Sequence, residues 1–205
     1  MRSLTLFTFA SLALATPAFA ATAGGEEDPG ASSTASQNLP VIGRVPRTCS
    51  ILQGRIQPGG LNNIAGLDGD TLRIIQFTDP ATLAVRSASA SINFDAVCNF
   101  PHQVRIESQN NGLWPVDERI SDRPAGFAYA VPYTADLSWG PITGRFATTG
   151  KARALSQQVF PVENAVAGNL SLRIAIEDGA SNVETRAPLV AGTYVDTVRI
   201  YLEPR

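Results

Sequence analysis

The sequence contains few of the residues on which catalytic sites depend. It has one histidine (His102) and two cysteines in 205 residues. It has no G-x-S-x-G turn, no H-E-x-x-H or C-x-x-C spacing and no phosphate-binding loop. A Ser-His-Asp triad could form only through His102, and no motif marks a nucleophile for it. We therefore expect no enzymatic activity, no cofactor and a structural role for His102; a hydrolase built around His102 is a distant alternative.

Charge is scarce as well. Charged residues make up 17% of the chain, and the formal net charge is −2. A balance this weak and mixed does not favour a nucleic acid or an anionic lipid surface as a partner. Apart from one run at the N-terminus, no segment is apolar over a length that could cross a bilayer. We expect no nucleic-acid partner and no membrane insertion.

The N-terminal run has the composition of a secretory signal peptide. Arg2 precedes an apolar stretch from Leu4 to Ala15, and Ala18-Phe19-Ala20 is a small-x-small cleavage pattern. A membrane anchor is the competing interpretation, but the run is shorter than the roughly 20 apolar residues that span a bilayer. The sequence predicts a signal peptide over residues 1–20, cleavage after Ala20 and secretion. The protein would pass through a periplasm before it reaches the cell surface.

The two cysteines, Cys49 and Cys98, are expected to form a disulfide, because an even pair in an exported protein normally does. Closing the loop between them would stabilise the fold by about 4 kcal/mol in the chain-entropy model. The alternative is a reactive thiol, since Cys98 lies four residues before His102. An oxidising compartment favours the disulfide over a free thiol.

Composition divides the mature chain into an extension, residues 21–48, and a domain, residues 49–205. Residues 21–38 contain no large apolar residue and are expected to be disordered, because they cannot bury enough surface to offset the entropy of ordering. Apolar residues return in "LPVIGRVPRT", just before Cys49. The extension is therefore flexible, with a short apolar segment at 39–45.

Alternating apolar residues predict strands throughout the domain. The clearest segments are 71–77, 91–100, 102–108, 127–139, 169–176 and 198–202. Asn111-Gly112 predicts a tight hairpin, residues 151–158 are expected to form a short helix, and no amphipathic helix is evident. The fold class expected is all-β, an antiparallel β-sandwich, with a closed barrel of strands as the alternative.

Two groups of side chains raise the question of a ligand. Asp68 and Asp70 lie in a glycine-rich turn that could bind Ca²⁺, but the further acidic positions of a calcium loop are missing. Trp114, Trp139 and the tyrosines could line a carbohydrate cleft, although aromatic residues at strand spacing more often lie in the core. We expect no metal site, and a sugar-binding platform is the minor alternative.

Three segments resemble spore coat protein U-like domains. "VCNFPHQVRIESQNNGL" and "GFAYAVPYTADLSWG" are similar to the stretch after the second cysteine and to the tyrosine-rich middle strand of that family. "AGTYVDTVRIYL" closely resembles its C-terminal signature; the matching residues are Gly192, Thr193, Tyr194, Asp196 and Val198. The similarity extends loosely from Cys49 to Leu202.

The family includes the pilins of archaic chaperone–usher pili. The resemblance implies an immunoglobulin-like sandwich that lacks its last strand, which a periplasmic chaperone supplies first and the N-terminal extension of the next subunit replaces by donor-strand exchange. Val198, Ile200 and Leu202 would form the edge of the acceptor groove. The donor strand would be residues 39–45, whose same-parity positions are Leu39, Val41, Gly43 and Val45. The expected partners are a chaperone, an usher and neighbouring subunits.

The leading functional hypothesis is thus a secreted structural subunit of a surface pilus or coat fibre. The alternative is a stand-alone periplasmic or extracellular binding domain, for carbohydrate for example, whose sheet is completed by its own N-terminal segment. A stable monomer would favour the binding domain, whereas heat-resistant multimers would favour the fibre.

Overall fold

The computed structural model describes residues 36–117 and 124–205 and divides the chain into two units, residues 1–43 and 44–205. The signal peptide predicted for residues 1–20 and the first part of the extension, 21–35, lie outside the described residues. In the first unit, residues 36–43 have no regular secondary structure and are exposed. Between residues 36 and 117, and again between 124 and 205, no helix has the length and apolar character needed to cross a membrane.

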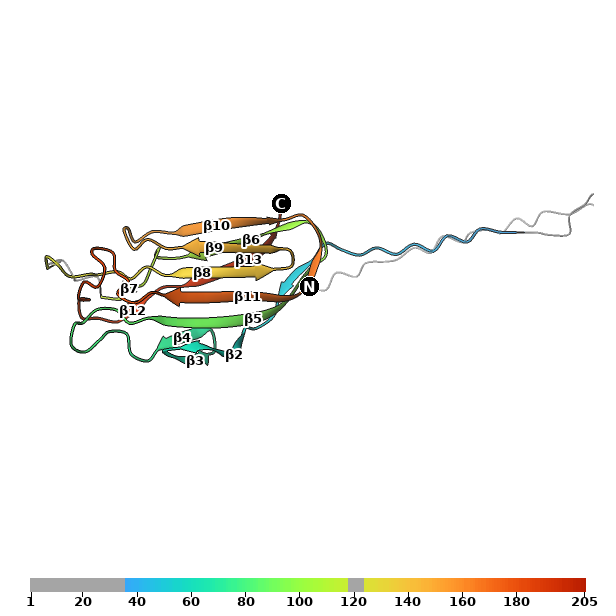
Figure 1. The fold of residues 1–205 in the computed structure, drawn as a ribbon. Coiled ribbons are helices and arrows are strands. Elements are labelled where there is room, and N and C mark those ends of the chain that lie inside the picture. Colours follow the sequence, from blue (N-terminus) through green and yellow to red (C-terminus); the bar gives the residue numbers. More distant parts are fainter. Residues whose placement is uncertain (1–35, 118–123) are drawn as a thin grey trace, which may run out of the picture. The chain divides into compact units, whose positions relative to one another are not determined.

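The second unit is all-β, and every pairing between its named strands is antiparallel (Figure 1). The larger sheet has the order β1-β5-β11-β8-β9, and β2 also pairs with β5. Its strands are β1 (Cys49–Ile51), β2 (Arg55–Asn62), β5 (Ala88–Cys98), β8 (Thr134–Trp139), β9 (Ile142–Ala147) and β11 (Val166–Ile176).

The smaller sheet has the order β10-β6-β13. Its strands are β6 (His102–Ser108), β10 (Ser156–Val162) and β13 (Val198–Pro204). Two short pairs complete the unit: β3 (Ile64–Asp68) with β4 (Thr71–Ile74), and β7 (Trp114–Pro115) with β12 (Tyr194–Val195). In Figure 1 β3 and β4 lie below β5, at one margin of the strands.

The two sheets pack face to face over one apolar cluster, which makes the unit a β-sandwich. On β6, His102, Val104 and Ile106 are fully buried, whereas Gln103 and Arg105, which alternate with them, are partly exposed. From the larger sheet the cluster receives Leu137, Trp139, Phe146, Leu170 and Leu172. Strict alternation of this kind arises because successive side chains on a strand point to opposite faces. The sandwich prediction is confirmed, and the sheets have free edges rather than closing into a barrel.

A second apolar cluster lies where the loops connect the strands. Tyr133, Val131 and Ile176 belong to it, together with Val85 and Leu189 from two long loops. This cluster gives the irregular segments a core of their own, so that they are held in place without long ladders of backbone hydrogen bonds.

The disulfide between Cys49 and Cys98 is present, as predicted. The two residues face each other in the register of β1 and β5, so the bond joins the first residue of one strand to the last residue of the other. Because Cys98 is oxidised, the alternative of a reactive thiol beside His102 is wrong.

The predicted strand over 127–139 is wrong in its first half. Only Thr134–Trp139 forms a ladder, and before it the chain makes two isolated bridges, Val131 with Leu113 and Ala128 with Leu189. Pro132 has no N–H to contribute to a ladder. The alternation also fails there, because Ala128 and Ala130 are fully buried while Phe127 and Tyr129 are partly exposed.

The short helix predicted at 151–158 is also wrong. Ser156–Val162 is strand β10, which pairs with β6 at every position from Ser156↔Ser108 to Val162↔His102. A long ladder with a central strand outweighs the weak helical preference of this segment. Strands β2, β9 and β10 were not predicted from the sequence.

The turn at Asn111-Gly112 adopts the backbone conformation expected of it, with φ of 55° and 130°. It does not close a hairpin, because it connects β6 to β7, and β6 pairs with β10 and β13 instead. The dipeptide therefore predicted the local geometry correctly and the pairing incorrectly.

Replacing both cysteines by serine is expected to lower the free energy of unfolding by about 4 kcal/mol, because the reduced chain regains the entropy of an open loop. Urea denaturation of the wild-type and Cys49→Ser/Cys98→Ser proteins measures the difference. A change below about 1 kcal/mol would show that the bond contributes little to stability.

Candidate functional site

The last strand, β13, is a free edge of the smaller sheet. It pairs with β6 on one side, from Val198↔Ser108 to Pro204↔His102, and no described strand pairs with its other side. Val198, Ile200 and Leu202 point toward the main apolar cluster but are only half-buried. The strand thus combines unpaired backbone groups with apolar side chains that lack full cover.

A second strand edge lies close to β13. Strand β1 pairs only with β5, and its Cα atoms come within 8 Å of those of β13. Ile51 of β1 is half-buried against the same apolar cluster. We call the unpaired side of β13, together with the half-buried side chains beside it, the open edge; these side chains are Ile51, Val198, Ile200 and Leu202.

Charged residues and one tyrosine line the outward face of β13. The Arg105 guanidinium lies 3.9 Å from the centre of the Tyr201 ring and donates to Glu203 at 3.0 Å and to Glu107 at 2.6 Å. Hydrogen bonds from Arg105 and Gln103 hold the pKa of Glu203 below its usual value. These contacts fix which face of β13 points to solvent, so the apolar face has to point toward the apolar cluster between the sheets.

Asp196 anchors the beginning of β13. Its carboxylate accepts hydrogen bonds from two hydroxyl groups and three backbone amides; the donors are Ser108 Oγ (2.5 Å), Tyr133 Oη (2.6 Å), Asn110 N (2.9 Å), Gly112 N (3.3 Å) and Thr197 N (2.7 Å). Burial, followed by the nearby charge of Asp196, raises the pKa of Tyr133. One side chain therefore ties β13 to the loop after β6 and to the segment before β8.

Sequence reasoning gave Asp196 no role. Apart from the adjacent Thr197, its partners lie 63 to 88 residues away, so no local spacing marks it. The only signal was its place in the C-terminal signature. Two neighbours there are also structural: the Tyr194 hydroxyl donates to the Val190 carbonyl at 2.8 Å, and the Thr193 carbonyl accepts from Val116.

The residues just before β1 are held by Asn99. Its Nδ2 donates to the Pro46 carbonyl at 2.8 Å, and its Oδ1 accepts from the Thr48 amide at 2.9 Å. The Arg47 guanidinium lies 5.7 Å from the centre of the Phe100 ring. We call this set of contacts the Asn99 clamp. It fixes the point at which the extension leaves the sandwich.

The four positions predicted for the donor strand lie in an exposed segment without secondary structure. Leu39 is 84% exposed, Val41 93% and Val45 81%, and Gly43 has no atoms near the place a Cβ would occupy. Isolated exposed apolar residues are ordinary, but here several of them follow one another within one short segment.

In the structure His102 lies in the core and has a structural role. The ring is fully buried, Nδ1 donates to the Phe100 carbonyl at 2.8 Å, and Nε2 accepts from Trp139 Nε1 at 2.8 Å. Both ring nitrogens are engaged, so neither is available as a general base.

The residues considered for ligands are dispersed. Trp139 and Trp114 are buried, so neither can present a ring to a sugar. Asp68 is the exposed last residue of β3, and Asp70 lies in the exposed turn between β3 and β4. Within residues 36–117 and 124–205, no three acidic, histidine or cysteine side chains are grouped as a metal site would need.

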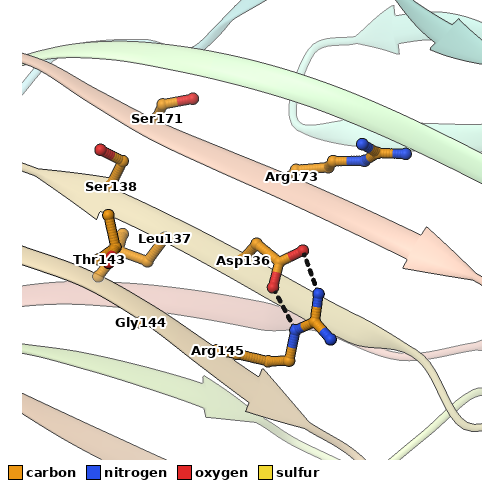
Figure 2. Close-up of a pocket in the computed structure, with 8 residues that line it drawn as sticks. All are labelled: Asp136, Leu137, Ser138, Thr143, Gly144, Arg145, Ser171 and Arg173. Carbon is orange, nitrogen blue, oxygen red and sulfur yellow. Dashed lines mark hydrogen bonds and ion pairs between the residues drawn. The ribbon is translucent and has the colours of Figure 1, made fainter.

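The outward face of β8, β9 and β11 carries a shallow, open depression (Figure 2). Asp136 accepts two hydrogen bonds from Arg145 opposite it, at 2.6 and 3.2 Å, and Arg173 is exposed. No aromatic ring lines it. The depression has the character of a polar sheet surface and offers no stacking platform.

Comparison with models of known protein families and with curated protein sequences finds no match. The resemblance to spore coat protein U-like domains therefore stays a prediction from sequence motifs, and the open edge is the feature from which a function is inferred.

Replacing Asp196 by alanine is expected to lower the free energy of unfolding by about 3 kcal/mol, because several partly buried donors lose their acceptor. The matched control is Asp178→Ala, which removes only an exposed pair with Arg186 and should change it by less than about 0.5 kcal/mol. Urea denaturation compares the two, and equal losses would contradict the anchoring role of Asp196.

Proposed function

We propose that this protein is a secreted structural subunit of a surface pilus or coat fibre and is assembled by donor-strand exchange. In this proposal the sandwich is immunoglobulin-like and lacks one strand beside β13. A periplasmic chaperone fills that position first, and an usher then exchanges the chaperone strand for residues 39–45 of the next subunit. The observation that carries the proposal is the open edge.

An unpaired sheet edge is costly to leave exposed, because its N–H and C=O groups recruit any available strand. Natural proteins usually blunt such edges with charge, proline or a bulge. On β13 the charged residues Arg199 and Glu203 lie on the outward face and pair with Glu107 and Arg105, whereas all three inward positions, Val198, Ile200 and Leu202, are apolar, and proline enters only at Pro204. An edge of this composition favours strand addition, in which backbone hydrogen bonds give affinity and alternate side chains give specificity.

The exposed segment before the Asn99 clamp has the complementary pattern. Leu39, Val41 and Val45 share one parity and would enter the open edge together, while Gly43 leaves room at one position. Pro40 and Pro46 lack N–H groups and would lie at the two ends of the added strand, where a missing donor costs least. The segment is thus matched to the edge in length and character.

The stand-alone binding domain is the second hypothesis. Burial of Trp114 and Trp139 removes the tryptophans as a carbohydrate platform, and the depression of Figure 2 supplies no other ring. No contact in the described residues favours this function over the fibre, and a stable wild-type monomer in solution would be the result that does.

Val41→Asp is expected to abolish assembly, because it would place an unpaired carboxylate in the apolar part of the open edge. Ile42→Asp is the matched control: Ile42 is 90% exposed and of the opposite parity, so it would face solvent in the added strand. The measurement is electrophoresis, without heating, of surface fractions from cells that produce each full-length variant.

Wild type and Ile42→Asp should give ladders of heat-resistant multimers, and Val41→Asp should give monomer only. Equal assembly of the two aspartate variants would show that parity within residues 39–45 does not matter. Such a result would exclude this segment as the donor strand.

A further inference from the structure

The N-terminal extension is joined to the sandwich by more contacts than its short first strand provides. We propose that the Cys49–Cys98 disulfide, together with the Asn99 clamp, is the mechanical anchor of the extension. Tension on the extension would enter the end of β5 directly and bypass the whole segment between the two cysteines. This inference rests on the proposed function, since only a subunit in a fibre has its extension pulled by a neighbour.

Without the disulfide, the extension would be fastened weakly. Strand β1 has three register pairs with β5, from Cys49↔Cys98 to Ile51↔Ala96. The next strand, β2, pairs with β5 through a ladder that is interrupted between Ile56 and Leu61. Short and irregular ladders open first under load, because few hydrogen bonds must break before the strand is released.

With the disulfide, the load reaches a strand in the interior of the larger sheet. Strand β5 pairs with β11 at eleven successive positions, from Cys98↔Val166 to Ala88↔Ile176, and β11 pairs in turn with β8. Cys98 itself is fully buried. A force applied at Cys98 is therefore shared along the longest ladder of the sandwich and its apolar core.

The Asn99 clamp acts at the same point. Asn99 follows Cys98 directly and holds Pro46 and Thr48, the residues just before Cys49. The turn that contains Asn99 is itself hydrogen-bonded to the core. One nitrogen of the His102 ring donates to the Phe100 carbonyl, and the other accepts from Trp139. The lone histidine thus serves as a positioning residue that connects the clamp to the buried face of β8.

Stretching single fibres in an optical trap tests the anchor. Without the disulfide, β1, β2 and the chain up to Ala88 can detach while β5 stays paired with β11. From Cys49 to Ala88 this is 39 positions, or about 14 nm of extended chain at about 3.6 Å per residue. Fibres of Cys49→Ser/Cys98→Ser are expected to lengthen in steps of about 14 nm per subunit at forces that leave wild-type fibres unchanged.

A control of equal stability separates anchoring from general stabilisation. Phe146→Leu alters the buried face of β9, away from β5 and from the extension. Urea is added to the Phe146→Leu fibres until the free energy of unfolding of their subunits equals that of the Cys49→Ser/Cys98→Ser subunits. The Phe146→Leu fibres should then keep their length at the forces at which the Cys49→Ser/Cys98→Ser fibres lengthen. Equal yield forces and equal step lengths in the two would overturn the inference.

A wild-type protein that forms no fibres would contradict the proposed function, and the anchor is then tested on the single full chain. The chain is stretched between handles at its mature N-terminus and at Arg205, with and without reductant. The inference expects the reduced protein to release about 14 nm, the chain from Cys49 to Ala88, in a separate, low-force step before its main unfolding event. Release of this length only within the main event would overturn it.

Discussion

The central constraint in this structure is the backbone hydrogen bonding of one strand, β13. A strand has two rows of backbone donors and acceptors, and burial without partners is costly for either row. Strand β13 satisfies one row through β6, while the other row borders half-buried Val198, Ile200 and Leu202. The apolar side chains need cover that only another segment can provide. The proposed donor-strand assembly would provide this cover, and it would explain why an exposed apolar segment precedes the domain.

Different contacts hold the two ends of β6, and each set positions a segment next to the open edge. At Ser108 the Asp196 carboxylate gathers the loops and sets the start of β13. At His102 the Asn99 clamp, the disulfide and the pair of ring-nitrogen contacts hold the point where the extension leaves the sandwich. In the proposed fibre, β13 and the extension held in this way could be joined to neighbours on both sides without unfolding. These polar contacts position β13 and the residues just before β1.

Alternation predicted the long strands well, because each of them buries one face against the opposite sheet. It failed for strands whose inward face lacks a continuous row of apolar side chains. In β9 the inward position between Ile142 and Phe146 is Gly144, and a Cβ there would lie 2.3 Å from the Phe160 ring of β10. The ring from one strand replaces the side chain of the other, so neither strand shows a full apolar pattern. Asp196 and Asn99 escaped notice for a related reason, since their partners are distant in sequence and come together only in the folded chain.

The central claim is that β13 receives a strand from another subunit. A high-resolution electron cryomicroscopy reconstruction of the fibre tests it most directly, because it shows which chain lies beside Val198–Pro204. Donor-strand assembly predicts residues 39–45 of the neighbouring subunit there, hydrogen-bonded along β13, with Leu39, Val41 and Val45 facing the core. A fibre in which that edge stays unpaired, or is covered by the subunit's own residues 39–45, would contradict it.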